Sequence, residues 1–362
     1  MEKVRVAIVG AGRITDLHYP AYKDFPRAEL VCVCDADAAV AERRAAQWGA
    51  TWWTSDFEAV LADPGIDMVE INTPHHLHHP MMLAAARAGK HVQLQKPMGS
   101  SLAECREMIA VAEECGIKFK VMENFVFYPP YRKAKELIDA GEIGELRSMR
   151  IHLGSGGSGG WYVPLDTWLW RLAETDHGGG PAIYDDGYHK FSIAMYFGGK
   201  VESVFSWIDR SFALVDSPAI ISWRHENGVL GCIDATFSPN LNVRSKYYSA
   251  DERVELTGTR GVIWVTRCTG QLSDEASLIL CRNGKKICFE DMRNDWVESF
   301  RDSTRHFIDC ILDGGQPFLT GEQALEVQQF CFAAIRSAAE GRSLAPASER
   351  IAAKQNCCTS SA

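Results

Sequence analysis

The sequence lacks the features that mark membrane, secreted or nucleic-acid-binding proteins. No apolar run reaches the roughly 18–20 residues that a transmembrane helix needs. The first residues, Met1–Arg5, do not form a signal-peptide pattern. There is no basic stripe, and the net charge is −9, so nucleic acid is not an expected partner. We therefore expect a cytoplasmic protein without a membrane or nucleic-acid partner.

Cysteine patterns typical of metal or redox centres are also missing. The 12 cysteines include no Cys-x-x-Cys pair, which argues against a zinc site or a thioredoxin-like centre. Cys32 and Cys34 alternate on a predicted buried strand, whereas Cys357 and Cys358 lie in a polar tail. We interpret the cysteines as reduced thiols that serve as small apolar side chains, as in a reducing compartment.

The composition is sufficient for a large buried core. Of the 362 residues, 46% are hydrophobic and 23% are charged, values typical of globular proteins. At roughly 100–200 residues per domain, this length predicts two domains.

Residues 1–125 predict an α/β domain with a doubly wound parallel sheet. Short apolar runs alternate with helical stretches, as in parallel sheets that are covered by helices on both faces. The expected strands are Val4–Val9, Leu30–Cys34, Met68–Ile71, His91–Leu94 and Phe119–Met122. The expected helices are Ile14–Lys23, Ala38–Trp48, His79–Ala88 and Leu102–Cys115.

The pattern changes after Tyr128-Pro129-Pro130, where the prolines stiffen the crossing. Longer alternating segments predict a large, mostly antiparallel sheet, so that residues 126–350 form an α+β domain and residues 351–362 a polar tail. The expected strands are Leu146–Leu153, Val201–Ile208, Ala219–Arg224, Val229–Phe237, Val254–Thr257 and Gly261–Val265. The expected helices are Tyr131–Ala140 and Glu322–Ala339.

A glycine-rich turn follows the first strand and predicts a dinucleotide site. In Gly10–Thr15, Gly10 permits the tight turn and Gly12 lets the backbone approach a pyrophosphate. The next helix presents free N–H groups to the anion, so Arg13 and Ile14 are also expected at the cofactor. Thr15 replaces the usual third glycine, a mild departure because that position serves helix–strand packing.

Asp35 ends the second strand and predicts the type of cofactor. An acidic side chain there accepts hydrogen bonds from the adenine ribose and repels a 2′-phosphate, which favours NAD over NADP. The structural alternative is that Asp35 caps the following helix. Arg43 and Arg44 could soften the preference.

Lys96 directly follows a predicted parallel strand, at the edge where ligands bind in this architecture. Its ammonium could orient a substrate hydroxyl or share its proton. The alternative is a surface lysine at a strand end.

A second chemical segment runs from Gly178 to His189, where glycines and a proline mark a loop that enters a helix. Asp185 and His189 are four residues apart and should project from one helical face. A carboxylate and an imidazole together suit removal of a hydroxyl proton while hydride leaves the same carbon. A purely structural Asp–His pair is the alternative. We reject Asp186, because on a helix it points about 100° away.

Together these segments resemble the glucose–fructose oxidoreductase, inositol dehydrogenase and rhizopine-catabolism family, written Gfo/Idh/MocA. The resemblance covers nearly the whole chain. It is carried, in order, by Gly10–Thr15, Asn72-Thr73-Pro74 with His78, Lys96-Pro97, Glu123-Asn124-Phe125 with Tyr128-Pro129, Trp170-Arg171, Asp185-x-Gly187-x-His189 and Gly321-Glu322.

The resemblance implies a Rossmann domain followed by a domain with a large open sheet that packs against another subunit, so a homodimer or higher oligomer is expected. It implies that Lys96 is the catalytic lysine, with Asp185 and His189 beside the reacting carbon and His189 as the proton-transfer group. The residues expected at the nicotinamide side are Thr73, Pro74 and His78, and Gln95 and Lys96 are also expected to contact the cofactor. Those expected near the substrate are Asn124, Tyr128, Trp161, Trp168, Arg171 and His189.

Two positions depart from the family pattern. The family usually has Glu before the lysine, where this chain has Gln95, so the lysine loses an acidic neighbour. The family often has Asp three residues after the histidine, where this chain has Ser192. Both departures bear on the pH behaviour and leave Lys96, Asp185 and His189 in place.

An aromatic segment suggests a carbohydrate substrate. Gly154–Gly160 reads as flexible and precedes Trp161, Tyr162, Trp168 and Trp170; sugar C–H faces stack on such rings. Core packing or a subunit contact is the alternative. His75, His76 and His79 beside His78 invite a metal interpretation, which we disfavour because no carboxylate or thiol lies among them.

The sequence therefore predicts an NAD-dependent oxidoreductase that interconverts a secondary alcohol and a ketone on a sugar, glycoside or inositol-like polyol. Oxidation of a glycoside at the sugar 3-position is one specific option. Two alternatives remain open: an NAD-dependent glycoside-cleaving enzyme of the same fold, and a non-catalytic NAD-binding regulator.

Overall fold

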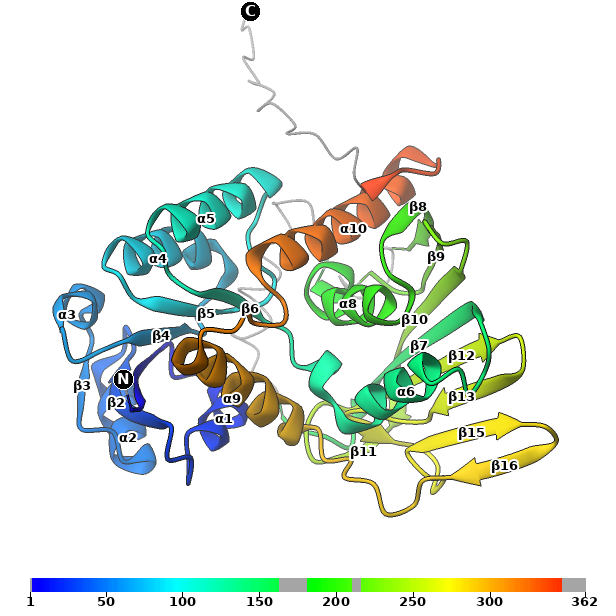
Figure 1. The fold of residues 1–362 in the computed structure, drawn as a ribbon, viewed down its shortest axis with the longest axis horizontal. Coiled ribbons are helices and arrows are strands. Elements are labelled where there is room, and N and C mark those ends of the chain that lie inside the picture. Colours follow the sequence, from blue (N-terminus) through cyan, green and yellow to red (C-terminus); the bar gives the residue numbers. More distant parts are fainter. Residues whose placement is uncertain (1, 163–180, 210–215, 347–362) are drawn as a thin grey trace, which may run out of the picture.

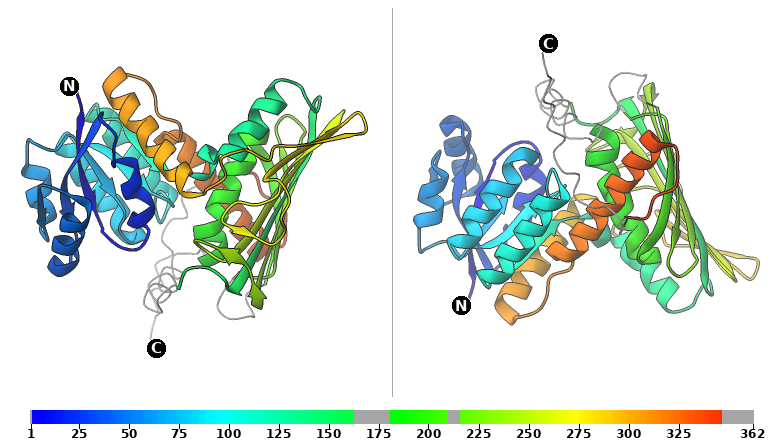
Figure 2. Two further views of the ribbon diagram at one scale, coloured as in Figure 1. Left: turned by 90° about the horizontal axis from the view of Figure 1, so that it is seen from below. Right: turned by 90° about the horizontal axis from the view of Figure 1, so that it is seen from above.

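The computed structural model describes residues 2–162, 181–209 and 216–346. Trp168 and Arg171, two of the expected substrate contacts, lie outside these ranges. Within them the chain forms two sheets that face each other across the molecule, with helices between them (Figures 1 and 2). None of the helices in the described ranges is both long enough and apolar enough to cross a bilayer.

The N-terminal sheet has six strands in the order β3-β2-β1-β4-β5-β6, and every neighbouring pair is parallel. This doubly wound order confirms the predicted Rossmann architecture. The strands are β1 Val4–Val9, β2 Ala28–Cys34, β3 Trp52–Thr54, β4 Met68–Ile71, β5 His91–Gln95 and β6 Phe119–Met122. The helices are α1 Thr15–His18, α2 Ala38–Trp48, α3 Phe57–Ala62, α4 His75–Arg87 and α5 Leu102–Glu114.

The first helix is shorter than the sequence predicts. Instead of running from Ile14 to Lys23, α1 ends at His18 and a 3₁₀ turn, Tyr19–Ala21, takes over. Pro20 cannot donate a backbone hydrogen bond and its ring crowds the preceding turn, which explains the change. The short β3 and α3 were not predicted.

The C-terminal sheet has eight strands in the order β16-β15-β13-β12-β7-β10-β9-β8. It is antiparallel except for the β7–β10 pair, as predicted. The strands are β7 Leu146–Ser158, β8 Val201–Ile208, β9 Ala219–His225, β10 Leu230–Asn242, β12 Ala250–Gly258, β13 Gly261–Val265, β15 Leu278–Arg282 and β16 Lys285–Cys288, and β11 Arg244–Ser245 and β14 Gly270–Gln271 form a separate ribbon. The helices are α6 Pro129–Asp139, α8 Gly187–Gly198, α9 Val297–Asp313 and α10 Gly321–Glu340.

The interpretation of Gly154–Gly160 as a flexible stretch is wrong for its first part. Residues 154–158 continue strand β7 beside β10, with a register shift before Ser158, and residues 154 and 155 also pair with β12. A Cβ on Gly156 would lie 2.7 Å from the carbonyl oxygen of Leu241. These glycines are therefore needed because neighbouring backbone comes too close for a side chain.

One helix of the second half returns to the first sheet. Phe307 and Ile308 of α9 are fully buried and share a hydrophobic cluster with Val4, Val6 and Ile8 of β1. In Figure 2, α9 lies against the N-terminal sheet although it is far from it in sequence. The α9 helix was not predicted, and it joins the two halves of the molecule.

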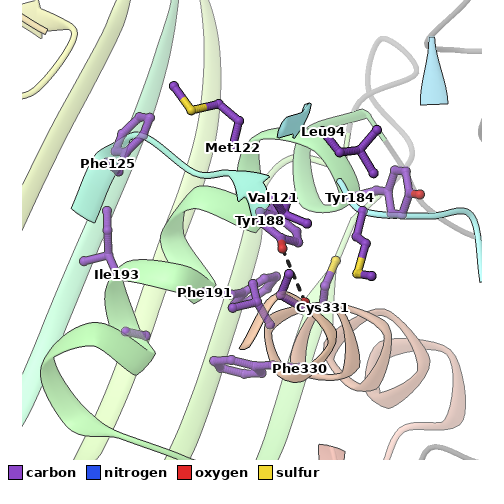
Figure 3. Packing of buried hydrophobic residues seen from close by; sticks show 14 of the residues in the cluster. Leu94, Val121, Met122, Phe125, Tyr184, Tyr188, Phe191, Ile193, Phe330 and Cys331 are labelled. Carbon is purple, nitrogen blue, oxygen red and sulfur yellow. Dashed lines mark hydrogen bonds between the residues drawn. The ribbon is translucent and has the colours of Figure 1, made fainter. Parts of the chain in front are cut away.

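The interior of the second half is packed by aromatic side chains. Tyr188 and Phe191 of α8 point toward Phe330 and Cys331 of α10 (Figure 3), and the Phe191 and Phe330 rings lie 4.5 Å apart. The Tyr188 hydroxyl donates to the carbonyl of Ala324, at 3.3 Å. Because α8 is fixed in this way, the His189 on it is held in a defined orientation.

Candidate active site

A cavity of about 810 Å³ lies between the two sheets. Its lining combines the carboxyl ends of the first parallel strands with the inner face of the C-terminal sheet and the start of α9. The predicted site residues among its lining are Gly10, Gly12, Arg13, Ile14, Asp35, Thr73, Pro74, Gln95, Lys96, Asn124, Trp161, Asp185 and His189. Segments far apart in sequence thus meet where ligands bind in this architecture.

The glycine turn has the geometry of a dinucleotide site. Gly10 has φ +86°, and a Cβ there would lie 2.7 Å from the Asn72 carbonyl oxygen, so only glycine fits. A Cβ on Gly12 would meet nothing within 4 Å, which leaves room for a ligand to approach the backbone. Thr15 is compatible with the turn because its hydroxyl donates to the Gly10 carbonyl at 2.9 Å.

Asp35 supports this turn and is not the helix cap. Its carboxylate accepts the backbone N–H groups of Ala11 at 2.8 Å and Asp37 at 3.0 Å. The cap of α2 is Asp37, whose side chain accepts the N–H of Ala39. The structural alternative for Asp35 is therefore removed, and its carboxylate lines the cavity.

The Asn72-Thr73 segment presents polar groups that fit a cofactor. The side-chain amide of Asn72 and the hydroxyl of Thr73 are buried and have no hydrogen-bond partner within the described residues. Buried polar groups normally have partners, and both residues line the cavity beside Pro74. A polar ligand such as the nicotinamide end of a dinucleotide would satisfy them.

His78 lies next to the cavity and outside its lining. It is fully buried, and its two ring nitrogens contact the carbonyls of Pro97 at 2.8 Å and Thr73 at 3.0 Å. His78 thus braces the two segments that carry Thr73 and Lys96.

Lys96 is paired with a carboxylate inside the cavity. Its ammonium donates to Asp185 Oδ1 at 2.5 Å and to the Asp185 carbonyl at 2.9 Å. The side chains of both residues are only about a tenth exposed, at 12% and 10%. His75 Nε2 lies 3.9 Å from the same carboxylate oxygen. Lys96 is therefore a buried, oriented charge rather than a surface lysine.

The carboxylate partner of His189 is Glu123 and not Asp185. His189 Nδ1 lies 2.6 Å from Glu123 Oε2, and the other Glu123 oxygen accepts the backbone N–H of Phe125 at 2.7 Å. The ring of Phe125 stacks on the imidazole with centroids 4.2 Å apart. Glu123 is fully buried. When the Nδ1–H group donates a hydrogen bond to Glu123, Nε2 carries the lone pair and can accept a proton.

The rejection of Asp186 is wrong in its geometry. Residues Pro181–Asp186 form a π-helical segment, and an α-helix begins only at Gly187. The 100° spacing of an α-helix therefore does not apply to this turn, and Asp186 lines the cavity together with Asp185. The sequence signal that could have revealed it is the Gly-Gly-Gly-Pro entry, which precedes a distorted first turn.

A buried ion pair, Lys190–Glu252, lies beside this turn. Lys190 contacts Glu252 and lies 3.8 Å from Asp186. Burial lowers the pKa of Lys190, but Asp186 and Glu252 outweigh it and hold that pKa above its usual value. Glu252 also accepts from the backbone and hydroxyl of Thr269.

The remaining expected substrate contacts divide into two groups. Trp161 lines the cavity, with the Arg13 guanidinium 4.2 Å from its ring centroid, and Asn124 does so while donating to Ser299 Oγ at 2.8 Å. Tyr128 is fully buried outside the lining, and its hydroxyl donates to the Asn294 carbonyl. Its placement is that of a core residue.

Comparisons with known proteins identify the family of this chain. Residues 4–123 match a family model described as an oxidoreductase family with an NAD-binding Rossmann fold, and residues 131–264 match the GFO/IDH/MocA C-terminal domain. The chain is 30% identical over 328 residues to scyllo-inositol 2-dehydrogenase (NAD(+)) of Bacillus subtilis, covering 88% of this chain and 89% of that one. The chain belongs to the Gfo/Idh/MocA oxidoreductase family.

Two further relatives carry related names. Levoglucosan dehydrogenase of Pseudarthrobacter phenanthrenivorans is 28% identical over 296 residues, 73% of each chain. A solved levoglucosan dehydrogenase in complex with NADH and levoglucosan superposes with a TM-score of 0.80 at 23% identity, covering 95% of this chain and 99% of that one. That structural likeness shows the shared fold.

Proposed function

We propose that this protein oxidises a secondary alcohol on an uncharged sugar, glycoside or inositol-like polyol, with NAD as the hydride acceptor. The observation that carries the proposal is the meeting of two oriented pairs, Lys96–Asp185 and His189–Glu123, in one cavity beside the glycine turn. Bound NAD supplies the carbon that accepts the hydride. The names of the relatives, which include inositol, apiose and levoglucosan dehydrogenases, support the substrate class.

The protein groups have separate tasks in this reaction. His189 Nε2 accepts the hydroxyl proton, because Nδ1 already donates to Glu123. The Lys96 ammonium, anchored by Asp185, donates a hydrogen bond to the same oxygen and stabilises the charge that develops on it. Asn124, which lines the same cavity, is assigned to a neighbouring hydroxyl of the substrate.

The preference for NAD rests on Asp35, whose carboxylate lies where the adenine ribose of a dinucleotide would be expected. A 2′-phosphate would be repelled there. We expect Asp35→Ala to raise the KM for NAD and to increase the ratio of kcat/KM with NADP to kcat/KM with NAD by about tenfold or more. An unchanged ratio of kcat/KM values for the two cofactors would contradict this role.

The charges of the described lining favour an uncharged substrate. The cations of the lining are Arg13 and Lys96, and carboxylates outnumber them: Asp35, Asp185, Asp186, Asp216 and Glu252. A sugar acid or sugar phosphate would meet net repulsion there. Trp161 offers an aromatic surface for the C–H face of a ring or for a glycoside's aglycone, which keeps 3-oxidation of a glycoside as the specific option.

A cofactor-reduction screen tests the proposal. Inositols, free sugars, 1,6-anhydro sugars and glycosides are compared with sugar acids and sugar phosphates, and NAD with NADP. We expect NADH formation with a neutral ring substrate, and loss of roughly 10²-fold or more in kcat for Lys96→Ala. Lys135, a partly exposed lysine of α6 that pairs with Asp139 and does not line the cavity, supplies the control, Lys135→Ala.

Three outcomes would overturn the proposal in different ways. Full activity of Lys96→Ala would remove the mechanism. Activity on free inositols with none on glycosides would remove 3-oxidation of glycosides. Cleavage of glycosides without net NADH release would assign the protein instead to the glycoside-cleaving class, which uses NAD transiently.

A further inference from the structure

A chain of buried polar side chains runs from the backbone of Lys96 into the core of the N-terminal domain. Gln95 Oε1 lies 2.9 Å from the Lys96 backbone nitrogen, and Gln95 Nε2 lies 2.9 Å from His18 Nε2. His18 Nδ1 contacts Glu70 Oε1. His18 and Glu70 are fully inaccessible to solvent. The proposed chemistry at Lys96 assigns no task to this chain.

The direction of each hydrogen bond between Lys96 and Glu70 follows from the Lys96 backbone N–H, at which the series begins. The Lys96 N–H can only donate, so the amide oxygen of Gln95 must face it and the amide nitrogen must face His18. An amide N–H can only donate, so His18 Nε2 must carry a lone pair. The His18 proton is then on Nδ1, where it is donated to Glu70. His18 is therefore neutral, in one fixed tautomer.

Glu70 ends the chain as a buried anion. Besides His18, the Tyr22 hydroxyl and Gln93 Nε2 donate to its carboxylate, the latter at 2.9 Å. The three hydrogen bonds that His18, Tyr22 and Gln93 donate stabilise the ionised form of this buried carboxylate. The charge of Lys120 on β6 interacts with the same carboxylate.

The side chains that contact His18 come from three elements: Glu70 on β4, Gln95 on β5, and Phe300 of α9, whose ring lies 5.0 Å from the imidazole. Glu70 is the titratable and charged group among them, and the titratable Tyr22 hydroxyl lies beyond it, where it donates to the same carboxylate. A proton added to His18 would need an acceptor at Nε2, where the Gln95 amide offers only a donor.

We propose that His18 and Glu70 are positioning residues for Lys96, acting through the side chain of Gln95. The chain fixes the backbone at the end of β5, so that the Lys96 ammonium reaches Asp185. Glutamine at position 95 also keeps His18 neutral. A glutamate there would accept from Lys96 but would present a second acceptor to His18, and only the imidazolium could satisfy carboxylates on both sides.

The first test concerns the proton on His18 and needs no substrate. The protein is labelled with ¹⁵N-histidine, and the His18 signals are identified by their loss in His18→Gln. In the native protein we expect one protonated ring nitrogen, Nδ1, at about pH 7. In Gln95→Glu we expect both ring nitrogens of His18 to be protonated at the same pH.

The second test is a double-mutant cycle on turnover, and this arm rests on the proposed function. In His18→Gln the new amide still accepts from Gln95 and donates to Glu70, so this variant should recover the turnover that His18→Leu loses. Gln95→Glu alone is accommodated by protonation of His18. The double variant, Gln95→Glu with His18→Gln, places a non-titrating amide between two carboxylates. The amide nitrogen can donate to one carboxylate, but the amide oxygen must then face the other, so two acceptors meet.

The expected numbers separate positioning from folding. The double variant lowers kcat by at least about tenfold more than the product of the two single effects, while the Kd for NAD differs by less than about threefold between the double variant and the single variants. Circular dichroism and Tm confirm that each variant is folded. A double variant whose kcat is the product of the two single effects would overturn the positioning role.

The two arms fail separately. If His18 in Gln95→Glu keeps one proton, or if native His18 carries two, the inference is wrong whatever the enzyme turns over. If no neutral sugar or polyol is oxidised while the histidine signals behave as expected, the proposed function is wrong. The assignment of protons along the hydrogen bonds from Gln95 to Glu70 then still stands.

Discussion

Glu123 controls which nitrogen of His189 is able to accept a proton. One of its oxygens accepts the backbone N–H of Phe125, and the other accepts from His189 Nδ1. A neutral amide could satisfy only one of these donors, because its nitrogen cannot accept. The charge of this residue is therefore less important than its having two acceptors.

This arrangement makes a prediction for Glu123→Gln. The Phe125 N–H takes the amide oxygen, so the amide nitrogen faces His189 and forces the ring proton onto Nε2. We expect kcat to fall roughly 10²-fold, with a smaller change in the Kd for NAD, because the base is lost. Steady-state kinetics and cofactor titration measure both.

The exposed Glu136 provides the matched control, Glu136→Gln, which should leave kcat within the error of the measurement. Native turnover in Glu123→Gln would show that His189 reaches its reactive tautomer without this carboxylate, and would remove Glu123 from the mechanism.

Much of the site could be predicted at the residue scale, because its local motifs carry their own geometry. Gly10, Asp35 and Lys96 each follow a strand, and the end of a parallel strand has a known place in the fold. The partners Asp185 and Glu123 could not be assigned, since they lie 89 and 66 residues from Lys96 and His189. No spacing rule reaches across such separations.

At the element scale, the sequence predicted the buried parallel strands and missed α9. Fully buried strands read as continuous apolar runs. The α9 helix instead buries Ser299, Ser303 and Thr304 beside its apolar residues. Hydroxyls on the buried face make such a helix read as polar, although it joins the two sheets. The same hydroxyls contact Asn124 and Lys120.

The glycines of β7 allow a test of strand packing. In Gly156→Ala, the new Cβ would lie 2.7 Å from the Leu241 carbonyl oxygen, so the backbone must move. We expect a loss of about 1–3 kcal/mol in the free energy of unfolding. Chemical denaturation measures it, with Gly315→Ala as the control, because a Cβ there meets its nearest neighbour at 3.6 Å. Equal stabilities of the two variants would contradict the close approach.

Lys120 gives the joint between β6 and α9 a dependence on pH. Its ammonium donates to Ser303 Oγ at 2.7 Å and to the Ser303 carbonyl at 2.9 Å. Burial lowers the pKa of Lys120 to about 7, despite the opposing influence of Cys310 and Glu123. In the unfolded chain the pKa is about 10.4. Between these values the unfolded state binds more protons, so this group makes stability rise with pH from about 7 to about 10.

Lys120→Met should remove that contribution. Methionine does not titrate, so the stability of the variant relative to the native protein should be highest at about pH 6.5. This relative stability should fall toward about pH 9, because the native protein gains stability over that range. Tm values across this range measure the difference, with the exposed Lys133→Met as control. A difference between variant and native protein that does not change with pH would contradict the assignment.

At the scale of the whole molecule, the C-terminal sheet has one face turned away from the helices (Figure 2). Trp207 and Ile220 lie opposite each other on β8 and β9 on this face and are 63% and 44% exposed. His152 and Asp234 pair on the same face. Exposed apolar side chains on an open sheet face favour contact with another copy, so this face is where we expect the subunit contact of a homo-oligomer.

In the expected homo-oligomer, the double variant Trp207→Glu, Ile220→Lys should weaken the contact between subunits and lower the mass in solution. The two new charges are cross-strand neighbours of opposite sign and satisfy each other within one chain. Light scattering after size-exclusion chromatography measures the mass. Leu272→Glu, at an exposed position after β14, is the control. A native protein that is already monomeric would remove the expectation.

The return of α9 to the first sheet also has a consequence for synthesis on the ribosome. Strand β6 ends at Met122, but Phe307 and Ile308 complete the apolar cluster around β1. Translation at roughly 5–20 residues per second needs about 10–40 s to cover that interval. During this time the nascent first domain exposes Val4, Val6 and Ile8 to chaperones, and a chain truncated before α9 would keep them exposed.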